Sequence, residues 1–225
     1  QAVTQELSAE EHLRWRQEFM ATTALIGDTQ GFYEQMEQWA AREEKAFPRL
    51  LRFFLWGASL LVIVSLIAGY GWGYEGFKVV CNILITINLF VFLTFIGKMQ
   101  KSKLGFENTY HLLYTFKRSI TLIEKATQFK SARFGLLQEK LHEGDESASR
   151  SISQLSRLLD DLDNVGNILV SIPLNILTFY HLHTYRKLLK WKQVHAKHIA
   201  LWLSVIAEVE VLHSFANFSY NNPSF

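Results

Sequence analysis

Two glycine patterns have the spacing of nucleotide-binding motifs. Residues 71–76, Gly-Trp-Gly-Tyr-Glu-Gly, match G-x-G-x-x-G, in which glycines let the backbone approach a pyrophosphate. That motif needs a preceding strand, and no strand pattern precedes it here. The same glycines have the spacing of a P-loop, but Phe77 stands where that loop needs a lysine. We therefore expect no cofactor site here and interpret these glycines as a turn.

Histidines in the C-terminal part could indicate a metal site: His181, His183, His195, His198 and His213. Positions two apart on a helix point to different faces, so His181 and His183 cannot bind one ion together. His195 and His198 could, but no Cys or carboxylate is spaced to complete a closed site. We expect no metal site. Cys81, the only cysteine, excludes a disulfide framework, and we expect no thiol catalysis.

Charged clusters offer two further kinds of chemistry. The carboxylates Asp160, Asp161 and Asp163 would need a pocket to act as an acid–base pair, so we interpret them as a solvated helix face and expect no catalytic residue. A basic run could contact phosphate or anionic lipid; it contains Arg186, Lys187, Lys190 and Lys192. The favoured alternative is the exposed face of a helix that packs through Leu188 and Leu189.

The longest apolar part of the chain is residues 53–97. Segments 53–72 and 79–97 carry no charge, and each is about 20 residues long, roughly what one helix needs to cross a hydrocarbon layer. Glycines and aromatic residues between them break the helix and suit a membrane interface. These features predict a transmembrane helical hairpin. The alternative is a pair of helices buried in a soluble bundle.

Charges beside the hairpin predict its orientation. Basic residues flank it on both sides, whereas the turn has only Lys78 against Glu75. By the positive-inside rule, the protein is a membrane protein with both soluble flanks in the cytoplasm. Asn82, Thr86 and Asn88 in the second helix are expected to form hydrogen bonds across the hairpin or to a partner helix.

Outside the hairpin, apolar residues repeat at three- and four-residue spacing, which is the helical period, and no segment alternates at period two. The sequence predicts an all-α fold, a helical bundle of long antiparallel helices with a two-helix transmembrane hairpin. We expect an N-terminal soluble helical pair at 1–48, the hairpin at 49–98 and a long-helix core or lever region at 99–225.

Local signals predict several helix boundaries. Ser8 and Glu11 have the spacing of a capping box. Pro173 should kink one long helix rather than end it. A last helix should begin near Ala196, with Glu208 and Glu210 facing different neighbours. We expect one of these two acids to pair with the basic run on the preceding helix, and a family resemblance of the last helix favours Glu210.

The composition of the chain excludes some classes of function but does not indicate one. The 225 residues carry a formal net charge of +2, too small to indicate a nucleic-acid surface by itself. The chain begins at Gln1 without signal-peptide features and ends shortly after Pro223. We therefore expect it to be part of a longer protein.

Residues 202–225 resemble a known family. Ala207, Glu210, Ser214, Ala216 and Pro223 are similar to the pattern that closes the helical core domain of MutS-type DNA mismatch-repair ATPases, just ahead of the ATPase domain. Residues 185–192 are similar to a helix of a MutS-related subgroup with membrane helices inside this core. Residues 14–19 look like the start of the same core. The chain departs from the family in lacking the ATPase, the mismatch-reading domain and a clamp insertion.

The resemblance implies a membrane-anchored core or lever region that couples a downstream ATPase domain to DNA or partner binding, with Glu210 and Ser214 at the joint. ATP and Mg would belong to that domain, so this region would not itself be an enzyme. The implied partners are DNA, a second copy of the chain and the ATPase domain, besides membrane lipid. The competing hypothesis is a non-enzymatic membrane scaffold that binds a partner unrelated to DNA.

We predict that this chain binds no ATP, because the glycine pattern lacks the phosphate-binding lysine at Phe77. Calorimetric titration of the purified chain with Mg-ATP should show no saturable heat. Saturable binding would contradict the interpretation of residues 71–76 as a turn.

Overall fold

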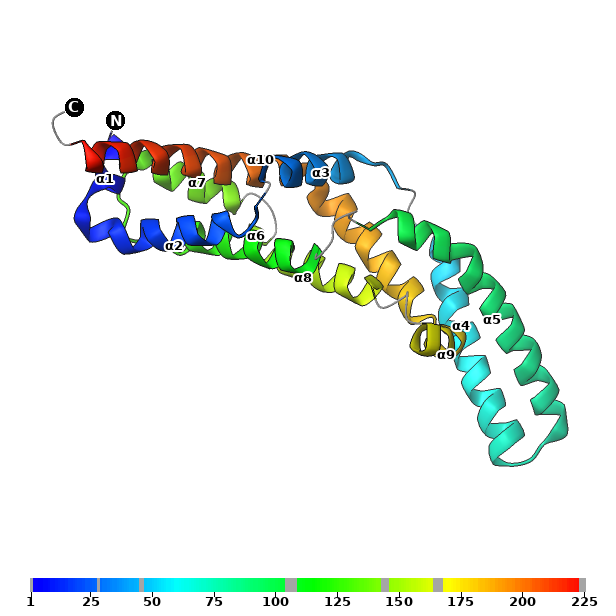
Figure 1. The fold of residues 1–225 in the computed structure, drawn as a ribbon. Helices are drawn as coiled ribbons and strands as arrows, with labels where there is room; N and C mark the ends of the chain where they lie inside the picture. The colour runs from blue at the N-terminus through cyan, green and yellow to red at the C-terminus, as the bar shows by residue number, and fades with distance from the viewer. Residues whose placement is uncertain are drawn as a thin grey trace. The chain divides into compact units, whose positions relative to one another are not determined.

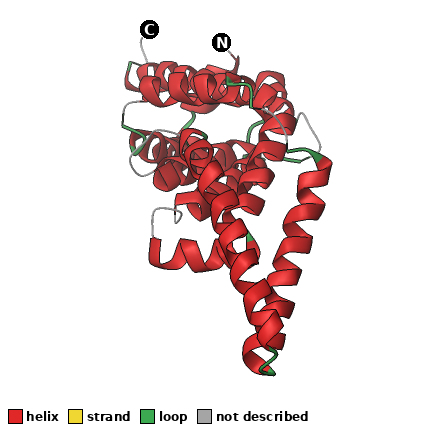
Figure 2. Cartoon of the chain, turned by 90° about the vertical axis from the view of Figure 1, so that its right-hand side faces the viewer, coloured by secondary structure: helices red, strands yellow, loops and turns green. Residues whose placement is uncertain are grey.

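The computed structural model describes residues 2–27, 29–44, 47–103, 109–142, 146–163 and 168–222. Within these ranges every regular element is a helix, and Figure 2 draws no strand. The predicted all-α class is confirmed.

The helices form two compact units that do not follow chain order. Unit 1 comprises Gln1–Arg42, Leu104–Arg157 and Lys192–Phe225, and unit 2 comprises Glu43–Lys103 and Leu158–Trp191. Helices α8 (Ala148–Asp163) and α10 (Tyr180–Asn221) contribute residues to both units. The division into segments 1–48, 49–98 and 99–225 stays a prediction about domains.

Unit 1 is built from helices (Figure 1), and aromatic side chains pack together in its core. Trp15 stacks on Phe19 with ring centroids 5.3 Å apart and meets Phe129 and Phe134 edge-on at 4.9 and 5.9 Å. Its indole N–H donates to the carbonyl oxygen of Leu122 at 3.2 Å, which satisfies the polar end of a large core side chain. Besides parts of α8 and α10, the unit contains α1 (Ala2–Ser8), a 3₁₀ turn (Glu10–His12), α2 (Leu13–Ala24), α3 (Thr29–Ala41), α6 (Thr109–Glu124) and α7 (Ala132–Leu141).

Two glutamates from distant segments cap helix N-termini in unit 1. Glu6 accepts hydrogen bonds from the backbone N–H groups of Lys130 and Ser131, at 2.6 and 3.1 Å, just ahead of α7. Glu124 accepts from the N–H and the hydroxyl of Ser149, at 3.1 and 2.5 Å, in the first turn of α8. Both carboxylates satisfy unpaired donors where the helix dipole is positive. Burial alone would raise the pKa of Glu6, but these hydrogen bonds outweigh it and lower that pKa.

The predicted capping box at Ser8 is wrong. Ser8 is the last residue of α1, and its hydroxyl donates to the carbonyl oxygen of Gln5 at 2.8 Å. Glu11 lies in the 3₁₀ turn that leads into α2. Ser8 therefore ends one helix and does not cap the start of the next, although its spacing to Glu11 matches a capping box.

Unit 2 contains a hairpin of α4 (Arg49–Leu66), one π-helical turn (Ile67–Gly71) and α5 (Glu75–Lys101), which lie side by side in Figure 1. Helix α4 packs against α5 and α9 (Ile168–Thr178), and its buried residues include the small residues Ala58, Ser59 and Ser65, which let helix backbones approach closely. The approach is tightest at Gly69, where an added Cβ atom would lie 2.7 Å from the backbone nitrogen of Lys78. The buried residues of α4 fall on one stripe: Leu55, Ala58, Ser59, Val62 and Ser65.

Among the described residues, three helical segments are long and apolar enough to cross a membrane: Leu50–Gly71, Glu75–Lys101 and Tyr180–Asn221. This suggests that the protein associates with membranes. The segments differ in how far the protein covers them, since 28% and 17% of the most apolar window is buried in the hairpin helices, against 44% in α10.

Polar side chains on α5 form hydrogen bonds within unit 2; the predicted bond across the hairpin or to another helix is confirmed for Asn82 and Asn88 and is wrong for Thr86. The amide oxygen of Asn82 accepts a hydrogen bond from the Tyr70 hydroxyl across the hairpin at 3.2 Å. Thr86 donates to the carbonyl oxygen of Asn82 on its own helix at 2.9 Å. Asn88 is fully buried, and its amide N–H donates to the carbonyl oxygen of Ile176 at 2.7 Å. These bonds lower the cost of polar groups in apolar surroundings, although the buried amide oxygen of Asn88 has no hydrogen-bond partner among the described residues.

Pro173 does not end its helix, as predicted, and a break in the C-terminal helices lies at Phe179. Pro173 sits inside α9 (Ile168–Thr178), and Phe179 adopts a positive φ of 50°. Helix α10 then runs without interruption, and its first turn is capped by Asn175, whose amide oxygen accepts from the N–H of His181 at 3.0 Å. The prediction of a separate last helix near Ala196 is therefore wrong.

We predict that Gly69→Ala destabilises the hairpin, because the new methyl group would push α4 away from the backbone of Lys78. The expected loss is about 1–3 kcal/mol, the usual cost of overpacking. Gly57→Ala is the matched control, since nothing lies within 4 Å of its added Cβ atom.

Gly57→Ala should leave stability unchanged or raise it by up to about 1 kcal/mol through helix propensity. Circular dichroism during unfolding in detergent measures both variants. Equal unfolding midpoints for Gly69→Ala and the wild type would show that the two backbones are not in close contact.

Candidate functional site

The basic residues expected to contact anions do not form one site. All lie on the single helix α10, but Arg186 and Lys187 line a pocket of unit 2, and Lys190 is exposed away from it. Lys192 belongs to unit 1, where it is buried with its Nζ 4.8 Å from the ring centroid of Trp39. Only Arg186 and Lys187 of this run are therefore placed to meet a ligand together.

The unit 2 pocket has a volume of about 460 Å³ and two unlike walls. Helix α4 supplies an apolar wall that includes Trp56, Leu60 and Ile63, and α10 supplies a polar wall with Arg186 and Lys187. The rings of Trp56 and His183 lie 5.0 Å apart and join the two walls. The remaining lining residues are Ser59, Thr178 and Tyr180.

The charged groups that line this pocket are both cations, and its other polar side chains include His183 and Tyr180, whose hydroxyl is hydrogen-bonded to Asp161. Ser59 and Thr178 donate their hydroxyl hydrogens to carbonyl oxygens of their own helices, at 2.9 and 2.7 Å. No carboxylate among the described residues forms an ion pair with Arg186 or Lys187, and Nε of Arg186 is buried without a hydrogen-bond partner there. The pocket can therefore bind an anion that carries an apolar group.

A buried polar cluster in unit 2 was missed by sequence reasoning. The Glu44 carboxylate accepts hydrogen bonds from the hydroxyls of Ser102 and Tyr185, the latter at 3.1 Å, and these two hydroxyls lie 3.3 Å apart. Next to it, Lys103 forms an ion pair with Asp163 at 2.9 Å. Asp163 is thus paired rather than simply solvated. These contacts join the end of α5 to α8 and α10.

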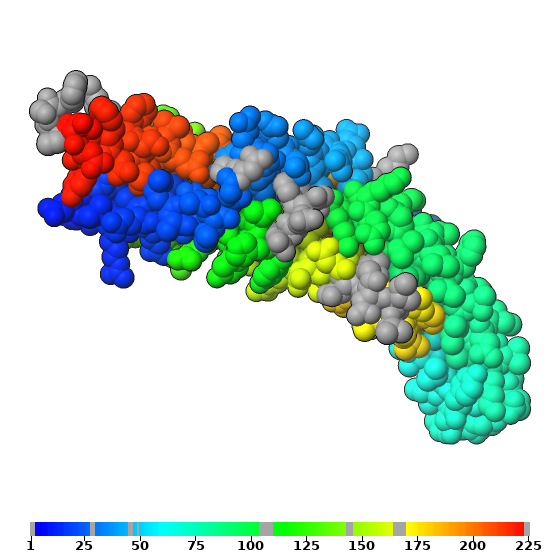
Figure 3. Space-filling model, viewed as in Figure 1, coloured from blue at the N-terminus to red at the C-terminus, as the bar shows by residue number. Residues whose placement is uncertain are grey.

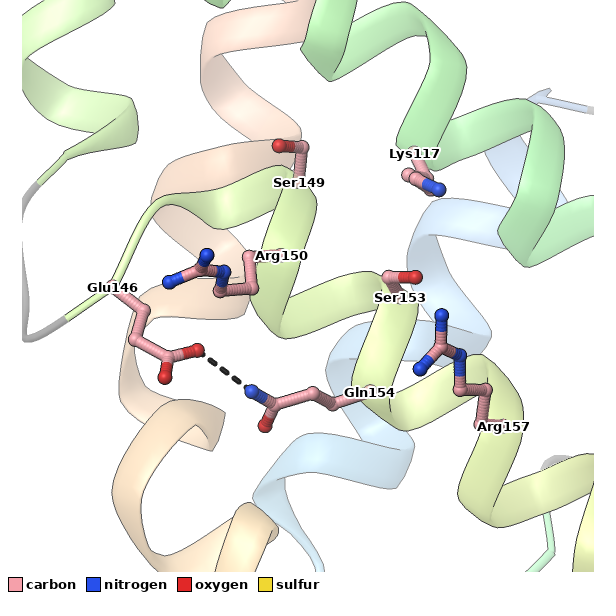
Figure 4. A pocket seen from close by; sticks show the side chains of 7 residues that line it. All are labelled: Lys117, Glu146, Ser149, Arg150, Ser153, Gln154 and Arg157. Atoms are coloured by element: carbon pink, nitrogen blue, oxygen red, sulfur yellow. Dashed lines mark hydrogen bonds between the residues drawn. The ribbon is translucent and has the colours of Figure 1, made fainter.

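Unit 1 has a second pocket, of about 420 Å³, shown in Figure 4. Lys117 comes from α6, whereas Arg150, Ser153 and Arg157 lie on one face of α8 at helical spacing. Figure 4 shows Lys117, Ser153 and Arg157 on one side of the pocket, and Glu146 bonded to Gln154 at 2.7 Å on the other. The cations lack ion-pair partners among the described residues, so this pocket can also accept an anion.

The residues expected at an interdomain joint lie on α10 within unit 1. Glu210 is half-buried near Tyr33 of α3; burial, and then the charge of Glu210, raise the pKa of the Tyr33 hydroxyl. Glu208 instead forms an ion pair with Arg133 of α7, so the two acids do face different neighbours. The Ser214 hydroxyl donates to the carbonyl oxygen of Glu210 at 2.9 Å. A role of Glu210 and Ser214 in a joint stays a prediction.

The predicted pairing of Glu210 with the basic run is wrong. Both belong to one continuous helix, and at about 1.5 Å per residue Lys192 and Glu210 are roughly 27 Å apart along it. The error follows directly from the missed continuity of α10.

The histidines are placed separately. His181 lies against Asn175, with its Nδ1 2.5 Å from the amide nitrogen, and His183 lies against Trp56. His195 and His198 both lie beside the ring of Trp202, at 6.3 and 6.1 Å. In the described part of the chain, no three His, Cys, Asp or Glu side chains gather as metal ligands would.

No protein-family model, curated protein or solved structure matches this chain. Its function must therefore be inferred from its residues and their geometry.

We predict that Lys192 stabilises unit 1 rather than binding a ligand. Lys192→Gln removes a buried cation from the face of Trp39 and should lower the free energy of unfolding by about 0.5–2 kcal/mol. Lys190→Gln makes the same charge change at an exposed position and should stay within about 0.5 kcal/mol of the wild type. Thermal unfolding in detergent compares them, and equal shifts would contradict the assignment.

Proposed function

We propose that this chain is a membrane-anchored helical core or lever region in which α4 and α5 span the bilayer. The observation that carries the proposal is the outer surface of the hairpin, which is apolar and exposed along both helices; on the face that Figure 3 shows, the hairpin is uncovered near its turn. An apolar surface of this extent marks a membrane or a protein partner. Its exposed residues include Phe53, Leu60, Leu61, Val64, Ile67, Val79, Ile83, Ile87, Phe90 and Leu93.

In this proposal α10 is a bundle helix and not a third span. Its apolar side chains are largely buried by unit 1, for example Trp202, Val205 and Ile206. It also carries the basic run Arg186 to Lys192, which would be costly in the middle of a bilayer. Basic residues at both ends of the hairpin, including Arg52 and Lys98, favour a cytoplasmic location for both flanks.

The proposal extends to the MutS-like resemblance. Ala207, Glu210, Ser214 and Ala216 lie on α10, the helix that contributes to both units. In a MutS-like protein, this region would couple a downstream ATPase domain, with its ATP and Mg, to DNA or partner binding. If the chain belongs to a MutS-like protein, a second copy of the chain is also an expected partner. The cations of the unit 1 pocket are the described groups best arranged to meet nucleic-acid phosphates.

The alternative is a non-enzymatic membrane scaffold unrelated to DNA. In that case the same hairpin would anchor the scaffold in the membrane. The sequence of the protein beyond Phe225 distinguishes the two. A G-x-x-x-x-G-K-[ST] motif within about the next hundred residues would support the MutS-like function, because that loop binds the phosphates of ATP. Its absence there would support the scaffold.

We predict that the wild-type chain stays in the membrane fraction during carbonate extraction of expressing cells. Val64→Arg should release it or lower its insertion, because an arginine at the middle of a spanning helix costs about 2.5–3.5 kcal/mol on the insertion scale. Val211→Arg is the matched control: Val64 and Val211 are similarly exposed, at 49% and 53%, but Val211 lies in unit 1.

Val211→Arg should leave the membrane fraction unchanged. Release of the wild-type chain by carbonate, or equal behaviour of both arginine variants, would contradict the proposed anchor.

A further inference from the structure

We infer that the unit 2 pocket binds the headgroup of an anionic phospholipid. The inference rests on the proposed membrane anchor, to which it adds a specific ligand. Three features carry it: the position of the pocket along α4, its two unlike walls, and two cations that form no ion pair within the described part of the chain.

The pocket begins where the membrane interface is expected. Arg52 and Trp56 lie one turn apart on α4, and basic and Trp residues together mark the boundary between headgroups and hydrocarbon. From Trp56 the lining continues along α4 to Ile63, roughly 10 Å further into the apolar layer. A lipid with its headgroup beside Trp56 would place an acyl chain along Leu60 and Ile63.

The opposite wall suits a phosphate group. Arg186 and Lys187 have no ion-pair partner among the described residues, and the buried Nε of Arg186 lacks a hydrogen-bond acceptor there. A guanidinium group matches phosphate oxygens through paired N–H donors, and a lysine adds a second charge. Two cations favour a lipid with net negative charge over a zwitterionic lipid.

The apolar wall distinguishes a lipid from a free phosphate ion. Trp56, Leu60 and Ile63 offer a small hydrophilic anion no contacts, whereas an acyl chain would cover them. The hydroxyls of Ser59 and Thr178 are bonded to their own helices and that of Tyr180 to Asp161, so Arg186 and Lys187, beside the ring of His183, are the charged groups that can meet the headgroup. The pocket therefore fits an amphipathic anion held at the bilayer surface.

The test uses the whole chain purified in detergent with equal amounts of phosphatidylglycerol and phosphatidylcholine, and native mass spectrometry counts retained lipids. The wild-type chain should retain phosphatidylglycerol preferentially. The double variant Arg186→Gln, Lys187→Gln should weaken that retention by roughly tenfold or more, as loss of charge-assisted hydrogen bonds predicts. Lys190→Gln, a charge change on the same helix outside the pocket, should retain lipid like the wild type.

Each contrary outcome has a definite meaning. Equal retention of both lipids by the wild type, or equal loss in Lys190→Gln and the double variant, would overturn the inference. Displacement of the lipid by inorganic phosphate at similar concentrations would show a phosphate site instead. Circular dichroism of each variant checks that the helices form; if the double variant does not fold, the single variants Arg186→Gln and Lys187→Gln are compared.

Carbonate extraction separates this inference from the proposed function. If the wild-type chain is inserted but shows no lipid preference, the pocket inference alone fails. If the wild-type chain is released from membranes, the anchor fails and the pocket inference fails with it.

Discussion

Polar groups on the hairpin must find partners within the protein, because most of its outer surface is apolar. This constraint explains the arrangement of unit 2. Hydroxyls such as that of Ser59 bond to their own helix, Asn82 reaches Tyr70 across the hairpin, and Asn88 reaches Ile176. Ile176 lies in the last turn of α9, where carbonyl oxygens lack helical partners, so the bond satisfies this carbonyl oxygen and the amide N–H of Asn88, whose amide oxygen stays buried without a partner among the described residues. Helix α9 packs against both α4 and α5 at this point.

Much of the fold could be predicted where the signal is local. Length and the absence of charge predicted α4 and α5, and the glycines predicted the turn between them. The path of α10 was missed because a new helix was expected near Ala196, where the helix in fact continues, whereas the break lies at Phe179, a non-glycine residue whose positive φ leaves no mark in the sequence. The capping box failed for a related reason. The helix N-termini of unit 1 take their caps from Glu6 and Glu124, whose positions depend on tertiary packing.

Less of the candidate site could be predicted. The basic run was recognised, but its division between a pocket, an exposed position and a buried contact depends on which face of α10 each residue occupies. Helical spacing could have separated Lys190 from Arg186 and Lys187 once α10 was known to be continuous. The apolar wall from Trp56, and the meeting of Lys117 with Arg157, could not have been found this way. Both features bring together segments that are far apart in sequence, and no local sequence pattern predicts such contacts.

The single hydrogen bond of Asn88 has a consequence for biosynthesis. Ribosomes deliver the hairpin well before α9, and domains generally fold as their segments emerge. During that interval Asn88 cannot reach Ile176, so the newly made hairpin carries an unpaired amide in an apolar helix. A chaperone, a water molecule or a neighbouring helix must cover that amide until α9 arrives. The docking of α9 therefore completes the maturation of the hairpin, and chains that stop short of α9 expose a group that quality control can recognise.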